Sequence, residues 1–160
     1  MGLDMYLMRR TNVQNWDFNK DKEHYQCNAK LNGKKHPVIN PRKISMIEEE
    51  IGYWRKANHI HNWFIQNVAD GKDKCQEIWL TEENIKDLLD TCKKVIASPD
   101  LAEEILPTAS GFFFGGTEYD EWYIQSTKDT IPILEDALNS LEISKREKLH
   151  SVSIIYQASW

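Results

Sequence analysis

The segment 52–64, GYWRKANHIHNWF, gathers side chains of the kinds that proteins use to hold nucleotides. The planar guanidinium of Arg55 can donate two parallel hydrogen bonds to a phosphate or a carboxylate. The ring of Trp54 can stack on a base, and the amides of Asn58 and Asn62 can hydrogen-bond a base edge or a sugar. These residue types predict a pocket for a small nucleotide-like ligand, provided that one local structure turns them the same way.

We expect that local structure to be a helix from about Ile44 to about Val68, which Gly52 could interrupt. Successive helical residues are separated by about 100°. The apolar stripe is then Tyr53, Ala57, Ile60, Phe64 and Val68, whereas Lys56, His59, Trp63, Gln66 and Asn67 fall mainly on the far side. Between them lies a polar shoulder formed by Trp54, Arg55, Asn58, His61 and Asn62. The alternative is an ordinary polar flank, in which Arg55 pairs with an acidic neighbour and the asparagines cap nearby backbone.

The two histidines of this segment do not form a metal motif on a helix. His59 and His61 are two residues apart, so their side chains point about 160° away from each other. A shared metal ion requires a helical spacing of three or four residues. We therefore expect His61 at the apolar edge of the helix and His59 in solvent.

Other residues could complete the ligand site. Asn32-Gly33 predicts a tight hairpin turn, which would present Lys34 and Lys35 at the rim of the protein. We assign stacking to Trp54 and Tyr119, and phosphate contacts to Arg55 and to Lys34 or Lys35. The predicted polar contacts to base or sugar come from Asn58, His61 and Asn62.

The segment FFFGGTEYDE predicts a short buried strand, a glycine turn and a helix start. Backbone amides at such a place can hold an anion. Thr117 and Asp120 instead resemble a capping box, and acidic residues are ordinary partners of a helix start. The carboxylates of Glu118, Asp120 and Glu121 could also hold Mg²⁺ or act as a general base, but no second acidic motif completes a metal site.

Two further kinds of site find little support in the sequence. His24 and Cys27 have the spacing of half a zinc site, with His36 nearby, but no fourth ligand is evident. No Cys or Ser lies in a nucleophile pattern with a placeable base. We therefore predict no metal, no cofactor and no catalytic residues.

The elements around these residues indicate an α+β or α/β fold. Alternation predicts an N-terminal strand in GLDMYLM. We also expect a short strand in EIWL and a C-terminal strand in VSIIYQASW. Helices are predicted after Thr81, which suits an N-cap, and before a kink or restart at Pro132. We expect one domain over residues 1–160, with a small mixed sheet packed on about three helices and a polar hairpin or loop excursion at about 9–43.

Composition excludes several classes of function. A chain of 160 residues with 41% hydrophobic and 28% charged residues is typical of one globular domain. A net charge of −5 disfavours general binding of duplex DNA but is compatible with a local basic patch. Three cysteines without paired spacing indicate free thiols, and no stretch has the length of a membrane span. We expect a cytoplasmic protein.

Four segments, MGLDMYL, GYWRKANHIHNWF, LPTASGFFFGGTEYDEWY and YQASW, resemble a family of small bacteriophage and prophage proteins. The resemblance covers both ends and the middle of the chain and leaves out the excursion. It implies no catalytic residues. It does imply a setting, the cytoplasm of an infected host, in which some small phage proteins sequester nucleotide signals of bacterial immunity.

The leading hypothesis is a non-enzymatic protein that binds a small nucleotide-derived ligand, as a phage sponge for a host immune signal. Surplus aromatic surface would suit a homo-oligomer. The second hypothesis is a phage protein that binds and inhibits a host protein. The third is a nucleotide hydrolase that uses Glu118, Asp120 or Glu121 together with His61.

Overall fold

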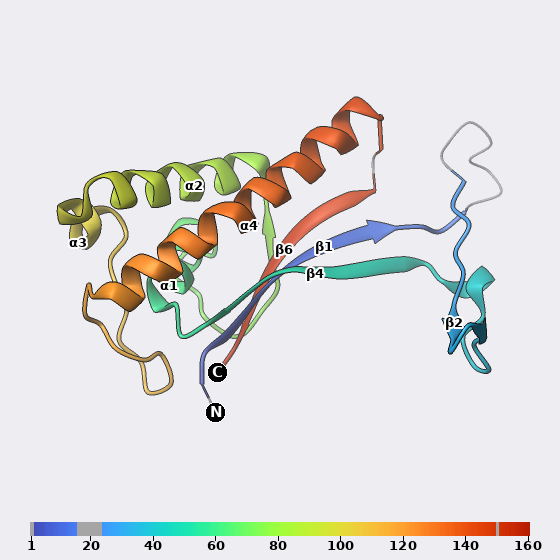
Figure 1. Ribbon diagram of the computed structural model, residues 1–160, viewed down its shortest axis with the longest axis horizontal. Helices are drawn as coiled ribbons and strands as arrows, with labels where there is room; N and C mark the ends of the chain where they lie inside the picture. The colour runs from blue at the N-terminus through green and yellow to red at the C-terminus, as the bar shows by residue number, and fades with distance from the viewer. Residues whose placement is uncertain (1, 16–23, 150) are drawn as a thin grey trace.

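The computed structural model describes residues 2–15, 24–149 and 151–160 and shows an α+β fold (Figure 1). A four-stranded sheet has the order β4 (Met46–Arg55), β1 (Asp4–Asn12), β6 (Val152–Ser159) and β5 (Ile78–Leu80). Every pairing in it is antiparallel. Of the two predicted fold classes, α+β is therefore confirmed.

The central strand β1 follows the predicted alternation. Leu3, Met5 and Leu7 are fully buried, and β1 pairs along its length with β4 on one side and β6 on the other. Leu7 lies opposite Tyr156 of β6, which is also buried. The N-terminal and C-terminal strands thus lie side by side in the middle of the sheet (Figure 1).

The predicted helix over 44–68 is wrong in its first part, because residues 46–55 form β4. Leu7 pairs with Gly52 but Met8 pairs with Glu50, so Ile51 is an extra residue that forms a bulge. A bulge interrupts the two-residue period of a strand, and this hid the strand in the sequence. The glutamates before it pair across the sheet, since Arg9 binds Glu49 at 2.8 Å.

Gly52 lies where β4 touches the long helix α4 (Glu121–Arg146). A Cβ atom at this position would overlap the Ile133 side chain and lie 3.3 Å from the Cβ of Leu7. The absence of a side chain therefore allows helix and strand to approach closely. Two residues further along β4, the Nε1 of Trp54 donates a 2.8 Å hydrogen bond to Oγ1 of Thr130 on α4.

The face of the sheet that carries the buried β1 side chains is covered by α1 (Asn58–Asn67), α2 (Glu82–Ala97) and α4. The short helix α3 (Ala102–Ile105) packs beside α2. Thr81 caps α2 as predicted and accepts a hydrogen bond from the Asn84 amide. Helix α4 runs through Pro132 as one element, so of the predicted kink or restart the restart does not occur. Its N-cap is Asp120 itself rather than Thr117. No described helix is long and apolar enough to cross a membrane.

The core between sheet and helices joins residues from the whole chain. Ile60 and Phe64 of α1, Leu88 of α2 and Leu134 of α4 are completely buried in it. The ring of Phe64 stacks on Tyr156 with centroids 4.0 Å apart. Burial of this kind supplies most of the stabilising free energy of a domain.

A hairpin projects beyond the far end of β1 and β4 (Figure 1). It consists of β2 (Lys30–Leu31) and β3 (Lys34–Lys35), joined by the predicted turn, with Asn32 at φ 50° and Gly33 at φ 79°. A short 3-10 helix (Pro41–Lys43) follows. β1 ends at Asn12 and β4 begins at Met46, so the segment between them is 13–45 rather than 9–43. Residues 16–23 of the predicted excursion lie outside the described residues.

Candidate functional site

A pocket of about 510 Å³ lies where β4 ends, beside the loop that leads into α4. We call it the Arg55 pocket. Its walls come from three segments: the end of β4, the loop at residues 111–116, which we call the glycine loop, and the start of α4. The lining residues are Arg55, Lys56, Gly115, Gly116, Glu118, Asp120 and Trp122.

The two cations of the Arg55 pocket are held loosely. The Arg55 side chain is 61% exposed, and its Nε lies 3.8 Å from Oδ1 of Asp4, beyond hydrogen-bonding distance. Lys56 has a left-handed backbone, with φ 58°, and its amide donates to the carbonyl of Leu3 at 2.7 Å. Both cationic groups remain available to a bound anion.

Gly115 is required where the loop meets Lys56. It has φ +90°, and a Cβ atom there would lie 3.2 Å from Cβ of Lys56. The loop backbone thus packs directly on the lysine side chain. This contact keeps the two walls of the pocket together.

The opposite wall is acidic. Oδ1 of Asp120 accepts a 3.0 Å hydrogen bond from the amide of Tyr123, which caps α4. The Glu118 carboxylate lies against Gly116, where a Cβ atom would meet it. The two carboxylates balance the two cations, so the pocket suits a ligand that carries both phosphate and hydrogen-bond donors.

Trp122 supplies the aromatic surface of the pocket. It is 46% exposed, and its ring meets the buried His59 edge-on, with centroids 6.5 Å apart. The ring is fixed on one side and open on the other. An aromatic face in this state can stack on a planar ligand.

Asn58 fixes the loop that forms the pocket. Its side chain is 1% exposed. Its Nδ2 donates to the carbonyls of Phe114 (3.1 Å) and Gly116 (2.7 Å), and its Oδ1 accepts from the Ala109 amide (3.1 Å). Asn58 therefore shapes the site without facing the ligand, as in the alternative interpretation that the asparagines bind backbone.

The two histidines occupy separate positions in the interior. His61 meets the Tyr156 hydroxyl at Nδ1 (2.8 Å) and the Asp73 carboxylate at Nε2 (2.9 Å). Burial raises the pKa of Tyr156 well above its ordinary value. Since both His61 nitrogens have partners inside the protein, the imidazole is not paired with the carboxylates at the start of α4.

His59 is buried rather than solvent-exposed, which corrects its predicted place. It packs on Tyr123 at 4.2 Å between centroids, and its Nε2 lies 3.1 Å from Oγ1 of Thr127. Burial lowers its pKa to about 3. The ring is therefore neutral at physiological pH and belongs to the support beneath Trp122.

The predicted shoulder separates in the structure because two of its members lie on a strand. Trp54 points into the core, 4% exposed, and cannot stack on a ligand. The next residue, Arg55, points the other way and reaches the pocket, as alternation along a strand requires. Asn62 donates to the Pro107 carbonyl at 3.1 Å.

The remaining predicted contacts lie outside the Arg55 pocket. Tyr119 is 39% exposed, and its hydroxyl accepts a 3.3 Å hydrogen bond from the Thr108 amide. Lys34 and Lys35 belong to the projecting hairpin, at the opposite end of β4 from Arg55. Ten residues of strand span roughly 30 Å, so these lysines and Arg55 cannot hold the same small ligand within one chain.

Sequence reasoning placed Lys56 on the far side of the helix and did not assign Trp122 to the site. On a continuous helix Lys56 would point away from Arg55, and only the strand end with its left-handed residue brings both to one pocket. The sequence did contain one signal for Trp122. It lies two residues after the capping Asp120, in the first turn of α4, beside the loop that forms the pocket. Among the described residues, no group of three His, Cys, Asp or Glu side chains could hold a metal ion.

Asn58→Ala should destabilise the protein by about 2 kcal/mol, because it leaves three loop groups without their partner. Urea unfolding followed by circular dichroism measures this change. The matched control is Asn62→Ala, which removes one bond to the same loop and should cost about 0.5 kcal/mol. Equal losses in the two variants would show that Asn58 does not anchor the loop.

His59 should make the protein less stable as pH falls. Its pKa is about 6.5 when unfolded and about 3 when folded, so protonation favours the unfolded chain below pH 6.5. Between pH 7.5 and pH 5 this linkage removes about 2 kcal/mol. His59→Gln should lack that loss when urea unfolding is compared at the two pH values. The same pH dependence in parent and variant would exclude His59 as its source.

Comparisons of the chain with protein-family models, curated proteins and solved structures found no match. A functional assignment therefore has to come from the geometry of the Arg55 pocket and its surroundings.

Proposed function

We propose that the protein binds a small nucleotide-derived ligand in the Arg55 pocket and acts as a binding protein rather than an enzyme. The observation that carries the proposal is the pocket itself, which combines two loosely held cations with an open tryptophan face. Its volume of about 510 Å³ lies within the range of small-molecule sites.

The lining suggests how such a ligand lies. Arg55 and Lys56 contact phosphate oxygens, the Arg55 fork in a bidentate manner. The base stacks on the free face of Trp122. The carboxylates of Glu118 and Asp120 accept hydrogen bonds from sugar hydroxyls or an exocyclic amine. Each group of a nucleotide then has a partner of matching chemistry.

The acidic wall favours compact ligands of low charge. Two carboxylates face the same space as the two cations, so a ligand with many phosphates would meet repulsion beyond the first one or two. Cyclic dinucleotides and nucleotide-sugar derivatives carry one or two phosphate charges beside each base or sugar. Together with the resemblance to phage proteins, this supports a sponge that sequesters a nucleotide signal of host immunity.

Arg55→Ala should weaken ligand binding by roughly 10- to 100-fold, the value of one or two charge-assisted hydrogen bonds. Trp122→Ala should weaken it by a similar factor through lost stacking. Isothermal titration calorimetry against a panel of cyclic dinucleotides, ADP-ribose derivatives and mononucleotides identifies the ligand and measures both variants.

The matched control is Trp79→Ala, which removes a tryptophan that is 57% exposed on β5, outside the Arg55 pocket. It should bind as the parent does. If no compound of the panel binds, or if Arg55→Ala keeps full affinity for one that does, the proposed site is wrong.

One further observation favours a second function, inhibition of a host protein. Phe112 is 96% exposed at the tip of the glycine loop, next to Phe113 at 4.8 Å between ring centroids. The predicted buried strand is absent here, and residues 112–114 form a turn instead. A fully exposed aromatic ring on an anchored loop is a typical hot spot for a protein partner.

Phe112→Ser tests this second function. Because the side chain contributes almost no burial, the variant should unfold at the same urea concentration as the parent. If the loop is a protein-binding site, the variant should lose a host protein that the parent and Trp122→Ala both retain in affinity capture. Retention of every captured protein by Phe112→Ser would contradict a docking role for the loop.

A further inference from the structure

Residues 24–45 form a segment with a charge opposite to that of the rest of the protein. We call it the basic arm. Its sequence contains no Asp or Glu and five cations, Lys30, Lys34, Lys35, Arg42 and Lys43. Because the whole chain carries −5 and the basic arm +5, the remainder carries −10. This charge is concentrated in a projection from one end of the sheet (Figure 1).

The basic arm contributes nothing to the buried core. Every one of its residues is exposed or only half-buried. Local hydrogen bonds hold its shape: the His36 amide donates to the Ala29 carbonyl at 3.0 Å, and Nδ1 of His36 accepts from the Ile39 amide at 2.9 Å. None of its five cations forms an ion pair with a described residue. An ordered segment with unpaired charge and no core is typical of a binding element.

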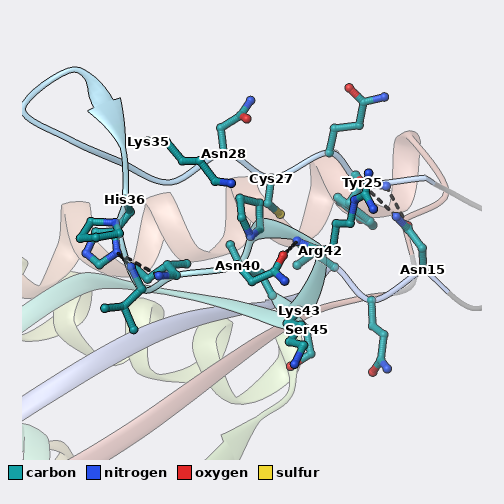
Figure 2. Close-up of a pocket in the computed structure, with 18 residues that line it drawn as sticks. Asn15, Tyr25, Cys27, Asn28, Lys35, His36, Asn40, Arg42, Lys43 and Ser45 are labelled. Atoms are coloured by element: carbon teal, nitrogen blue, oxygen red, sulfur yellow. Dashed lines mark hydrogen bonds between the residues drawn. The ribbon is translucent and has the colours of Figure 1, made fainter.

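The cations of the basic arm surround a hollow of about 990 Å³. Figure 2 shows Lys35 extending from the hairpin toward Cys27, with Asn40, Arg42 and Lys43 below them. Oδ1 of Asn40 accepts a 3.1 Å hydrogen bond from the Arg42 amide, which fixes this wall. The hollow is several times larger than one phosphate group, so its cations suit an anion that is extended.

Neutral groups complete the lining. Asn28 and Asn40 offer amides that can donate to a ligand, whereas the Asn15 amide binds the Tyr25 backbone at both ends. Apolar side chains lie beside them, with Val38 85% exposed and Ile39 44% exposed. The hollow thus combines contacts for phosphates, for base edges and for the flat faces of bases.

We propose that the basic arm binds single-stranded nucleic acid, with phosphodiester groups on Lys35, Arg42 and Lys43 and bases over the amide and apolar wall. A purely acidic peptide such as polyglutamate would use the cations but has no flat or apolar group to lie on Val38 and Ile39. A rigid duplex would bring its phosphates toward the acidic remainder of the protein, beginning at Glu48. This site is separate from the Arg55 pocket, because the two lie at opposite ends of β4.

The test is fluorescence anisotropy of a labelled 20-nucleotide mixed-sequence DNA strand with the full chain. Three phosphate contacts would lower affinity by about 20-fold between 50 mM and 200 mM salt. The triple variant Lys35→Ala, Arg42→Ala, Lys43→Ala should bind at least about 10-fold more weakly and reduce the salt slope by about 2. Circular dichroism should be unchanged, since none of the three side chains is buried.

The control variant Lys72→Ala, Lys74→Ala, Lys128→Ala removes the same charge from exposed positions outside the basic arm and should change affinity less than about 2-fold. Arg55→Ala should also leave the affinity for the DNA strand unchanged, because Arg55 lies outside the basic arm. The proposal is overturned if the strand does not bind at 50 mM salt, or if both triple variants lose affinity equally. Equal binding of the matching duplex, or of a labelled 20-residue polyglutamate, also overturns it.

Discussion

One buried amide, that of Asn58, determines whether this protein has a pocket at all. The loop from Pro107 to Asp120 has no regular secondary structure, and three hydrogen bonds from Asn58 connect it to the start of α1. Beneath that contact, Leu3 donates from its amide to the Phe113 carbonyl and ties the loop to the end of the sheet. With the loop fixed, Gly115 meets Lys56 and the start of α4 presents Trp122. Asn58, which the sequence suggested as a ligand contact, instead positions Lys56 and Trp122, which can contact a ligand.

The sequence predicted the parts of the fold whose periodicity is regular. The alternation of Leu3, Met5 and Leu7 correctly indicated a half-buried strand, and the cap at Thr81 correctly marked a helix start. β4 was missed because Ile51 adds a residue to the strand and because three glutamates favour a helix in isolation. The tertiary pairing of two of those glutamates, Glu49 with Arg9 and Glu48 with Arg10, overrides that preference.

The candidate site was predicted in part. Arg55 was identified from its chemistry, which does not depend on the surrounding element. Trp54 was misplaced because it lies on a strand, where adjacent residues face opposite sides. His59 does lie on a helix, but Tyr123 and Thr127 of α4 cover the side that was expected in solvent. The exposure of Phe112 could not be inferred, since a run of three phenylalanines ordinarily indicates a core strand. Only the loop's anchoring through backbone carbonyls explains why that ring remains in solvent.

The segregation of charge between the basic arm and the rest of the chain gives the molecule a permanent electric dipole. Such a molecule rotates in the field of a large anion before it touches the surface, so the basic arm arrives first. Orientation of this kind acts over about one Debye length, roughly 8 Å at physiological ionic strength. The same dipole draws the positive end of one molecule toward the negative end of another in dilute buffer. Self-attraction should therefore be greatest at low ionic strength, and added salt should increase the solubility of the protein.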